Sequence, residues 1–290
     1  MGSGLECPRW QGPPEHGNLE QGDPRLFRQS VEKREHPVGA LAPAGVVEVE
    51  LGMPLPIPPL QDVVRLTGPD IDTTVANFRK YLRGEGPAWS YDPSKRLAKA
   101  VFASEMTRKA AVAACGQRGR VIGRPFNAQV GGLIWDAAQD RGRFMCHDLT
   151  ARYLHLRSDM AIKVNPSFFF VEDGRPILFY LQPRSGHVPS KDGLRVIASA
   201  IHSLYAVDEW ANADMLLLDL SKPEGCKERA VVPYSFADLP PLPIAETERF
   251  FQRFVDAYDL LTLEGVERAT RRPRPSKDLG AGLFDAPPAE

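Results

Sequence analysis

The sequence lacks the segments that would direct a chain to a membrane or to the secretory pathway. No apolar run approaches the roughly 20 residues that a membrane-spanning helix requires. Residues 1–17, MGSGLECPRWQGPPEHG, contain neither the charged start nor the apolar stretch of a secretory signal. We therefore expect a protein that has no membrane partner and resides in the cytoplasm.

Recognised metal and cofactor motifs are also missing. The four cysteines include no Cys-x-x-Cys pair, which argues against a structural zinc site, and Cys146, His147 and His155 stand at irregular spacing. The sequence has no Walker loop, no G-x-S-x-G elbow, no H-E-x-x-H and no dinucleotide fingerprint. It therefore predicts no metal site and no cofactor.

The sequence also has almost no net charge. Lys and Arg number 36 and Asp and Glu 37, so the formal charge is -1. Such a balance gives no general attraction to nucleic acid, and any basic binding surface must be local. The hydrophobic content of 43% and the charged content of 25% are ordinary for a globular protein. A length of 290 residues favours one main domain with appendages.

The composition divides the chain into three parts. Up to about residue 60 it is dense in proline, glycine and charge and ends in MPLPIPPL, which predicts a disordered leader and an extended arm over residues 1–60. Within it, the alternation of Val46–Leu51 would suit an edge strand. We expect an α/β domain over 61–265 and a basic disordered tail over 266–290. The arm or the tail could dock a protein partner.

Hydrophobic periodicity predicts the elements of the domain. One long helix begins at Asp92-Pro93 and ends near Gly116, and a second covers Asn127–Gln139, where paired glycines imply close packing. The remaining expected elements are short helical pieces in 61–82, strands at 152–156, 160–164, 214–220 and 231–236, and helices at 194–205 and 245–261.

The most informative segment is Lys163–Arg184, KVNPSFFFVEDGRPILFYLQPR. Two apolar runs, Phe168–Val171 and Ile177–Leu181, flank an Asp-Gly turn, which is a strong hairpin signal. Unbroken apolar runs indicate strands that are covered on both faces. The segment therefore predicts the centre of a mixed sheet flanked by helices, with joint burial of Phe169, Val171, Leu178, Leu216 and Leu218.

This layout resembles the PD-(D/E)xK nuclease superfamily, whose core is a helix, three strands, a helix and a further strand. Pro166 matches the proline of the family motif. Ser167 stands at the position of the aspartate, Tyr180 at that of the acidic residue and Gln182 at that of the lysine. The resemblance implies a restriction-endonuclease-like core with a degenerate motif and no catalytic residues at these positions.

Phosphodiester hydrolysis in that family requires hard oxygen ligands for magnesium and a lysine near the water. Serine, tyrosine and glutamine supply neither. A relocated site could use other acids, but Glu172 in the turn lies five residues from Ser167, or roughly 16 Å along a strand. Glu105 and Asp159 remain as fallback acids, and magnesium is expected only in that alternative.

Basic residues gather on the predicted helix that starts at Asp92, in the loop after it and near the end of the hairpin. Such a group could follow a phosphate backbone, although a solvated helix face would have the same composition. The candidate nucleic-acid contacts are Lys95, Lys99, Arg108, Lys109, Arg118, Arg120, Arg124 and Arg184, with Arg96 beside them.

Three hypotheses follow from these patterns. The leading one is a catalytically degenerate nuclease-like protein that binds DNA or RNA or serves as an assembly subunit. The second is an active magnesium-dependent nuclease that uses Glu105 and Asp159. The third is a protein-binding scaffold, without nucleic acid, that recruits partners through the proline-rich arm or the tail.

Overall fold

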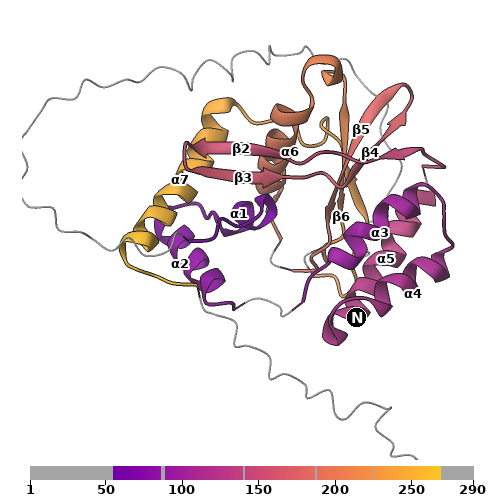
Figure 1. Ribbon diagram of the computed structural model, residues 1–290, viewed down its shortest axis with the longest axis horizontal. Coiled ribbons are helices and arrows are strands. Elements are labelled where there is room, and N and C mark those ends of the chain that lie inside the picture. Colours follow the sequence, from indigo (N-terminus) through magenta and orange to yellow (C-terminus); the bar gives the residue numbers. More distant parts are fainter. Residues whose placement is uncertain (1–54, 86–88, 140, 187, 224, 269–290) are drawn as a thin grey trace, which may run out of the picture.

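A computed structural model describes residues 55–268 except 86–88, 140, 187 and 224 (Figure 1). The predicted leader up to residue 54, including Val46–Leu51, and the tail from residue 269 lie outside the described residues. The described end of the proline-rich arm, residues 55–59, forms no helix or strand, and Pro59 has extended backbone angles. Leu55 and Pro58 are buried there, and the hydroxyl of Tyr258 donates a hydrogen bond to the carbonyl oxygen of Leu55 at 2.7 Å.

A five-stranded mixed sheet forms the centre of the described chain. Its order is β1-β4-β5-β6-β7, in which β5 and β6 are parallel and the other neighbours are antiparallel. The predicted mixed α/β architecture with helices flanking a central sheet is therefore confirmed. The strands are β1 Cys146–His147, β4 Phe168–Glu172, β5 Arg175–Gln182, β6 Asp214–Asp219 and β7 Val232–Tyr234.

The β4–β5 hairpin forms as the Asp-Gly turn predicts. Asp173 has φ 50° and Gly174 φ 75°, the pair of positive values that a two-residue type I′ turn requires. β5 is the middle strand and is buried from Ile177 to Gln182.

The predicted joint burial of five residues at the sheet centre is wrong for β4. Val171 is 50% exposed, because β1 pairs with β4 only at Phe169 and Phe170 and leaves the end of β4 as an edge. Phe169 is only half-buried, although it is paired with His147 and its ring contacts Trp210. Leu178 also faces one side of the sheet, whereas Leu216 and Leu218 face the other. Covered strands thus place side chains in two separate cores.

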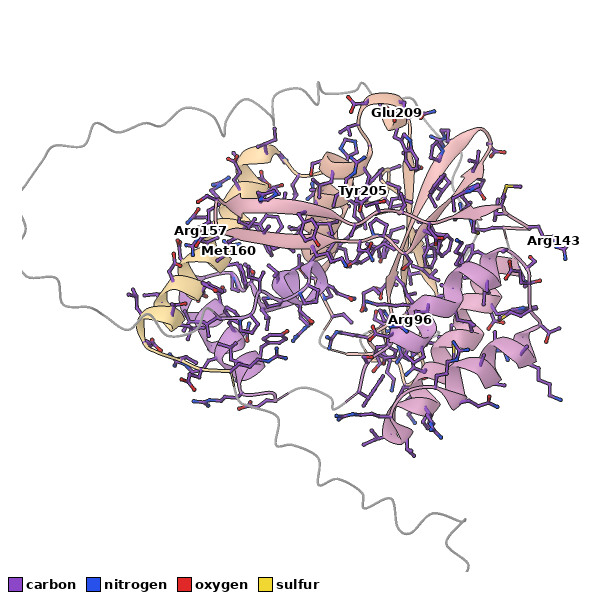
Figure 2. All side chains as sticks on the ribbon, viewed as in Figure 1. Arg96, Arg143, Arg157, Met160, Tyr205 and Glu209 are labelled. Atoms are coloured by element: carbon purple, nitrogen blue, oxygen red, sulfur yellow. The ribbon has the colours of Figure 1, made fainter. Side chains whose placement is uncertain are left out.

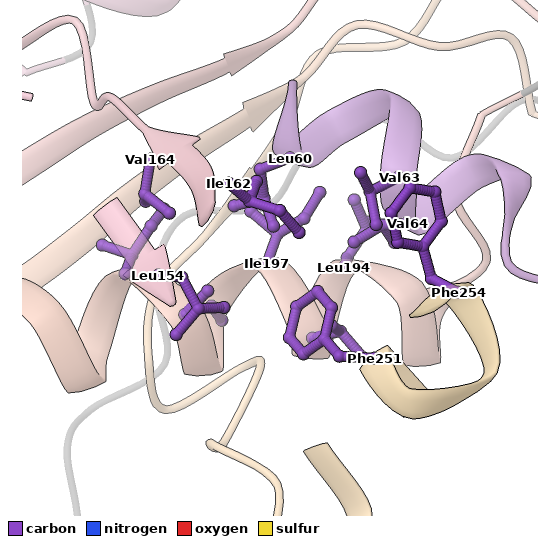
Figure 3. Packing of buried hydrophobic residues seen from close by; sticks show 14 of the residues in the cluster. Leu60, Val63, Val64, Leu154, Ile162, Val164, Leu194, Ile197, Phe251 and Phe254 are labelled. Carbon is purple, nitrogen blue, oxygen red and sulfur yellow. The ribbon is translucent and has the colours of Figure 1, made fainter. Parts of the chain in front are cut away.

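The first core lies between the sheet and a layer that contains a second, two-stranded sheet (Figure 1). Figure 3 shows side chains from helices of this layer meeting those of the small hairpin in that core. The layer consists of α1 Leu60–Leu66, α2 Ile71–Leu82, α6 Lys191–Tyr205, α7 Ile244–Leu263, β2 Arg152–Arg157 and β3 Met160–Val164.

The second core lies under α3 Asp92–Phe102, α4 Arg108–Gln117 and α5 Arg124–Gln139. The long helix that we predicted from Asp92 to Gly116 is therefore two helices. Ser104 has φ 57° between them, and the Thr107 side chain caps α4 by accepting a hydrogen bond from the amide of Ala110. Lys95 and Lys99 consequently do not share a helix face with Arg108 and Lys109.

Candidate functional site

Two of the three motif positions from the family resemblance lie on the same face of β5. Tyr180 and Gln182 are two residues apart at the carboxyl end of this strand, so their side chains point to the same face. Both residues are buried. Ser167 precedes β4, and its amide donates to the carbonyl oxygen of Phe179 at 2.8 Å, which places Ser167 beside Tyr180. The structure thus brings the three positions to one end of the sheet.

A buried polar network fills that end of the sheet. Gln182 is fully buried, and its Oε1 accepts hydrogen bonds from Gln61 Nε2 at 2.7 Å and from the Arg184 amide at 2.9 Å. Its Nε2 donates to Asp219 Oδ1 at 3.1 Å and to the Arg184 carbonyl at 3.2 Å. Because both acceptor and both donor capacities of the amide are used, Gln182 is held in one position.

Asp62 of α1 is the acidic centre of the same network. Its Oδ1 accepts from Arg184 Nη2 at 2.7 Å and from Arg65 Nη2 at 3.1 Å. Lys95 of α3 lies within electrostatic range of Asp62, and burial lowers the pKa of its ammonium group against the opposing influence of the Asp92 and Asp62 carboxylates. Asp62 therefore already holds two guanidinium groups in hydrogen bonds.

Burial also shifts the other titratable groups of the network. It raises the pKa of the Tyr180 hydroxyl, and it raises the pKa of Asp219 against hydrogen bonds from Ser221 and Gln182. Among the described residues, no group of three or more His, Cys, Asp or Glu side chains could hold a metal ion. What this end of the sheet presents is a set of mutually satisfied polar groups.

Arg229 ties the network to the helices and was not anticipated from the sequence. It is buried, and its Nη1 donates to the carbonyl oxygens of Pro183 at 2.7 Å and Leu220 at 2.8 Å, just beyond the ends of β5 and β6. Its Nη2 donates to the Tyr91 hydroxyl at 2.7 Å and its Nε to Gln129 Oε1 at 3.1 Å. No sequence motif marks an arginine whose partners are mainly carbonyl groups.

The fallback acids lie in different parts of the molecule. Glu105 follows α3 and lines a shallow groove of about 760 Å³ together with Arg143. Asp159 lies in the β2–β3 turn, where it accepts from Arg157 Nε at 2.6 Å. Figure 2 shows Arg157 and Arg143 at opposite ends of the view. The structure therefore does not bring Glu105 and Asp159 together.

Several predicted nucleic-acid contacts have partners within the protein. Lys99 pairs with Asp148 at 2.8 Å, Arg184 with Asp62, and Arg108 with both carboxylate oxygens of Asp136. With Lys95 half-buried in the polar network, four of the eight predicted residues are paired with a carboxylate or partly buried. Arg108 stays exposed beside Asp136, and Lys109, Arg118, Arg120 and Arg124 are exposed as well.

Three of these arginines lie where α4 turns into α5, and we name residues 118–126 the α4–α5 corner. Arg118, Arg120 and Arg124 are exposed, and neither Arg118 nor Arg124 is paired with a carboxylate in the described part of the chain. Residues 106–135 contain five Arg or Lys and no Asp or Glu. The corner therefore carries a local positive charge in a chain of formal charge -1.

Apolar side chains are interspersed with these arginines. Val121 and Ile122, in the 3₁₀ turn Val121–Gly123, are 73% and 64% exposed, and Phe126 is 41% exposed. Grouped exposed apolar side chains, unlike singly scattered ones, are a feature of binding surfaces. The corner combines cations with accessible apolar surface.

Aromatic stacking and buried hydrogen bonds hold the corner in one conformation. The ring of Trp89 stacks on Phe126 with centroids 4.8 Å apart and planes 6° apart, and it packs closely over Gly123, where a Cβ would lie 2.8 Å from the Trp89 Cβ. Asn127 Nδ2 donates to the carbonyl oxygens of Ser90 and Gly123, each at 3.0 Å. Ser94 Oγ donates to Asn127 Oδ1 at 2.7 Å. The arginines thus project from a well-anchored turn.

Comparison with known proteins gives no relative to which this arrangement can be referred. No protein-family model, no curated protein and no solved structure matches this chain. The nuclease-like family assignment therefore stays a prediction. Among the described residues, no helix combines the length and the apolar character that crossing a membrane requires.

Proposed function

We propose that this protein binds nucleic acid through the α4–α5 corner and that its domain is a nuclease-like core without a catalytic site. The order α5, β1, β4, β5, α6, β6 supports the core, because it follows the helix, three strands, helix and strand of the nuclease layout. In this view the β2–β3 hairpin is an insertion between the first and second core strands.

The observation that carries the binding proposal is the set of exposed arginines at the corner. Arg118, Arg120 and Arg124 fall within seven residues, and the nearest acidic residues in the sequence are Glu105 and Asp136. Arginine at an exposed, anchored turn suits phosphate groups, because its planar guanidinium can donate two parallel hydrogen bonds. Neutralisation of phosphates releases counterions and supplies most of the affinity for a nucleic acid of any sequence.

Cleavage is not part of the proposal. Tyr180 and Gln182 stand where the resemblance places the acid and the lysine, and Gln182 uses all of its hydrogen-bonding capacity inside the protein. Magnesium needs several hard oxygen ligands in an accessible position. A relocated nuclease site would require Glu105 and Asp159 to meet, but Glu105 lies in the groove after α3 and Asp159 in the β2–β3 turn, in different parts of the molecule.

The proposal is tested by measuring binding and cleavage on the same samples. We expect the protein to bind single-stranded DNA, duplex DNA or RNA, and to leave all three intact with magnesium or manganese. Arg118→Ala/Arg124→Ala should weaken binding while thermal unfolding stays unchanged, since exposed substitutions rarely alter stability by more than about 0.5 kcal/mol.

A matched control removes the same charge elsewhere. Lys163 of β3 and Arg249 of α7 are exposed, and both belong to the layer on the other face of the sheet. Lys163→Ala/Arg249→Ala should therefore retain wild-type affinity. Equal losses in the two double variants, or cleavage abolished by Glu105→Ala or Asp159→Ala, would contradict the proposal.

The exposed Val121 and Ile122 also favour a second candidate, a protein-binding surface. Apolar residues ringed by arginines are common at protein interfaces. No measurable nucleic-acid binding at low salt would favour that candidate, in which the same corner contacts a protein.

A further inference from the structure

We infer that the α4–α5 corner prefers single-stranded nucleic acid to a duplex, an inference that rests on the proposed function. The reason is the side chains that accompany the arginines. Phosphate contacts alone would serve a duplex and a single strand alike, but a paired and stacked base offers no face to a protein side chain. Unpaired bases do offer a face, and proteins that bind single strands use aromatic side chains for stacking beside a basic surface.

Phe126 has the geometry of such a stacking residue. One face of its ring lies against Trp89 in a nearly parallel stack, so the orientation of the ring is set before any ligand arrives. The residue nevertheless keeps 41% of its surface exposed. Trp89 is itself supported edge-on by Tyr91, with ring centroids 4.5 Å apart, and Tyr91 is held by buried Arg229. Because these side chains are already ordered, a base that joins the stack would bind with little loss of side-chain entropy.

Arginines and exposed apolar residues alternate along the corner. Arg118 and Arg120 precede the exposed pair Val121 and Ile122, and Arg124 precedes Phe126 by two residues. A single strand has a complementary arrangement, with anionic phosphates on one side and apolar base faces on the other. A duplex would meet only the arginines and would leave the apolar side chains against its hydrated backbone. The complementarity therefore favours an unpaired strand.

The test compares two probes at one salt concentration. The probes are a fluorescein-labelled oligothymidylate of about 16 nucleotides, the upper end of the site size of a single-strand-binding fold, and a mixed-sequence duplex of the same length. We expect tighter binding of the oligothymidylate. Phe126→Ala should weaken that binding roughly five-fold or more, as expected for loss of one stacked base, and should leave duplex binding unchanged.

Two further variants make the result specific. Phe126→Leu keeps an apolar side chain but removes the ring, and it should lose most of the same affinity if stacking is responsible. Tyr153→Ala removes an aromatic residue that is 53% exposed on β2, away from the corner, and should have no effect.

The outcomes separate this inference from the proposed function. Equal affinity for both probes together with neutral Phe126 variants would overturn the single-strand preference and leave nucleic-acid binding standing. A full loss in Phe126→Ala with wild-type affinity in Phe126→Leu would also overturn stacking. No binding of either DNA probe, nor of a single-stranded RNA of the same length, would overturn both proposals.

Discussion

Individual residues decide how the polar network at the end of β5 and β6 should be understood. Gln182 stands where the family resemblance places a lysine, and the structure gives it four internal hydrogen bonds with Gln61, Asp219 and Arg184. The side chain thus stabilises the junction of α1 with the sheet. Its role is structural.

Gln182→Ala should therefore destabilise the protein. The substitution leaves the Gln61 amide and the Arg184 backbone amide without their acceptor, which costs about 1–3 kcal/mol. Chemical denaturation would measure the loss in the free energy of unfolding. Gln139→Ala removes an exposed glutamine of α5 and is the control. Equal stability of the two variants would contradict the structural role of Gln182.

Asp219 gives the network a pH dependence. Burial raises the pKa of its carboxyl group in the folded state above the ordinary value of 3.8. Because the raised pKa means that the folded state binds more protons, protonation of Asp219 stabilises the fold. This stabilisation is fully present below the unfolded pKa and is lost as pH rises through the folded pKa.

Asp219→Asn removes this ionisation and keeps a side chain of the same shape. The variant should have a higher free energy of unfolding than the wild type at about pH 7, and the difference should shrink as pH falls towards about 4. Urea denaturation at a series of pH values would show the two curves converging. A difference that grows as the pH falls would contradict the assigned shift.

At the scale of elements, the sequence predicts those features that depend on a few neighbouring residues. The β4–β5 turn follows from Asp173-Gly174, because two successive positive φ angles favour this pair. The break between α3 and α4 was not predicted, because the positive φ falls on Ser104, with no Gly or Pro to mark it. The polar network could not be predicted either, since Gln61 and Gln182 are 121 residues apart in the sequence.

The sequence predicts only part of the candidate site, because only the charge cluster is a local feature of the sequence. The exposed arginines at positions 118, 120 and 124 were recognisable as a charge cluster in the sequence. The carboxylate partners of Lys99 and Arg184, and the stacking of Trp89 on Phe126, depend on tertiary packing and leave no periodic signal.

The α4–α5 pair supports the corner, and its close approach depends on Gly131. A Cβ at this position would lie 2.7 Å from Cys115 Sγ and 3.1 Å from the Ala111 carbonyl oxygen. Gly131→Ala should therefore lower the free energy of unfolding, because overpacking costs roughly 1–3 kcal/mol and can exceed the gain in helix propensity of about 1 kcal/mol.

Gly132→Ala is the matched control for that experiment. Its added Cβ would meet only side-chain atoms, Arg108 Nη2 and Val112 Cγ2, each at 3.3 Å. The Arg108 group lies at the end of a long side chain and can move. Thermal or chemical denaturation should therefore show a smaller loss than for Gly131→Ala, and the reverse order would contradict the packing argument.

At the scale of the whole molecule, charge is separated although it sums to nearly zero. Five basic residues and no acidic ones occupy residues 106–135, while the formal charge of the chain is -1. The other residues of the chain therefore sum to a formal charge of -6, so the α4–α5 corner is more positive than the chain as a whole.

The salt dependence of binding tests the central claim most directly. Affinity for a single-stranded oligonucleotide would be measured at several salt concentrations for the wild type and for Arg118→Ala/Arg124→Ala. If both arginines contact phosphates, the magnitude of the slope of log affinity against log salt should fall by about 1.4, twice the single-strand value of about 0.7 per contact. The same slope in both proteins, with equal affinities, would contradict binding at the corner.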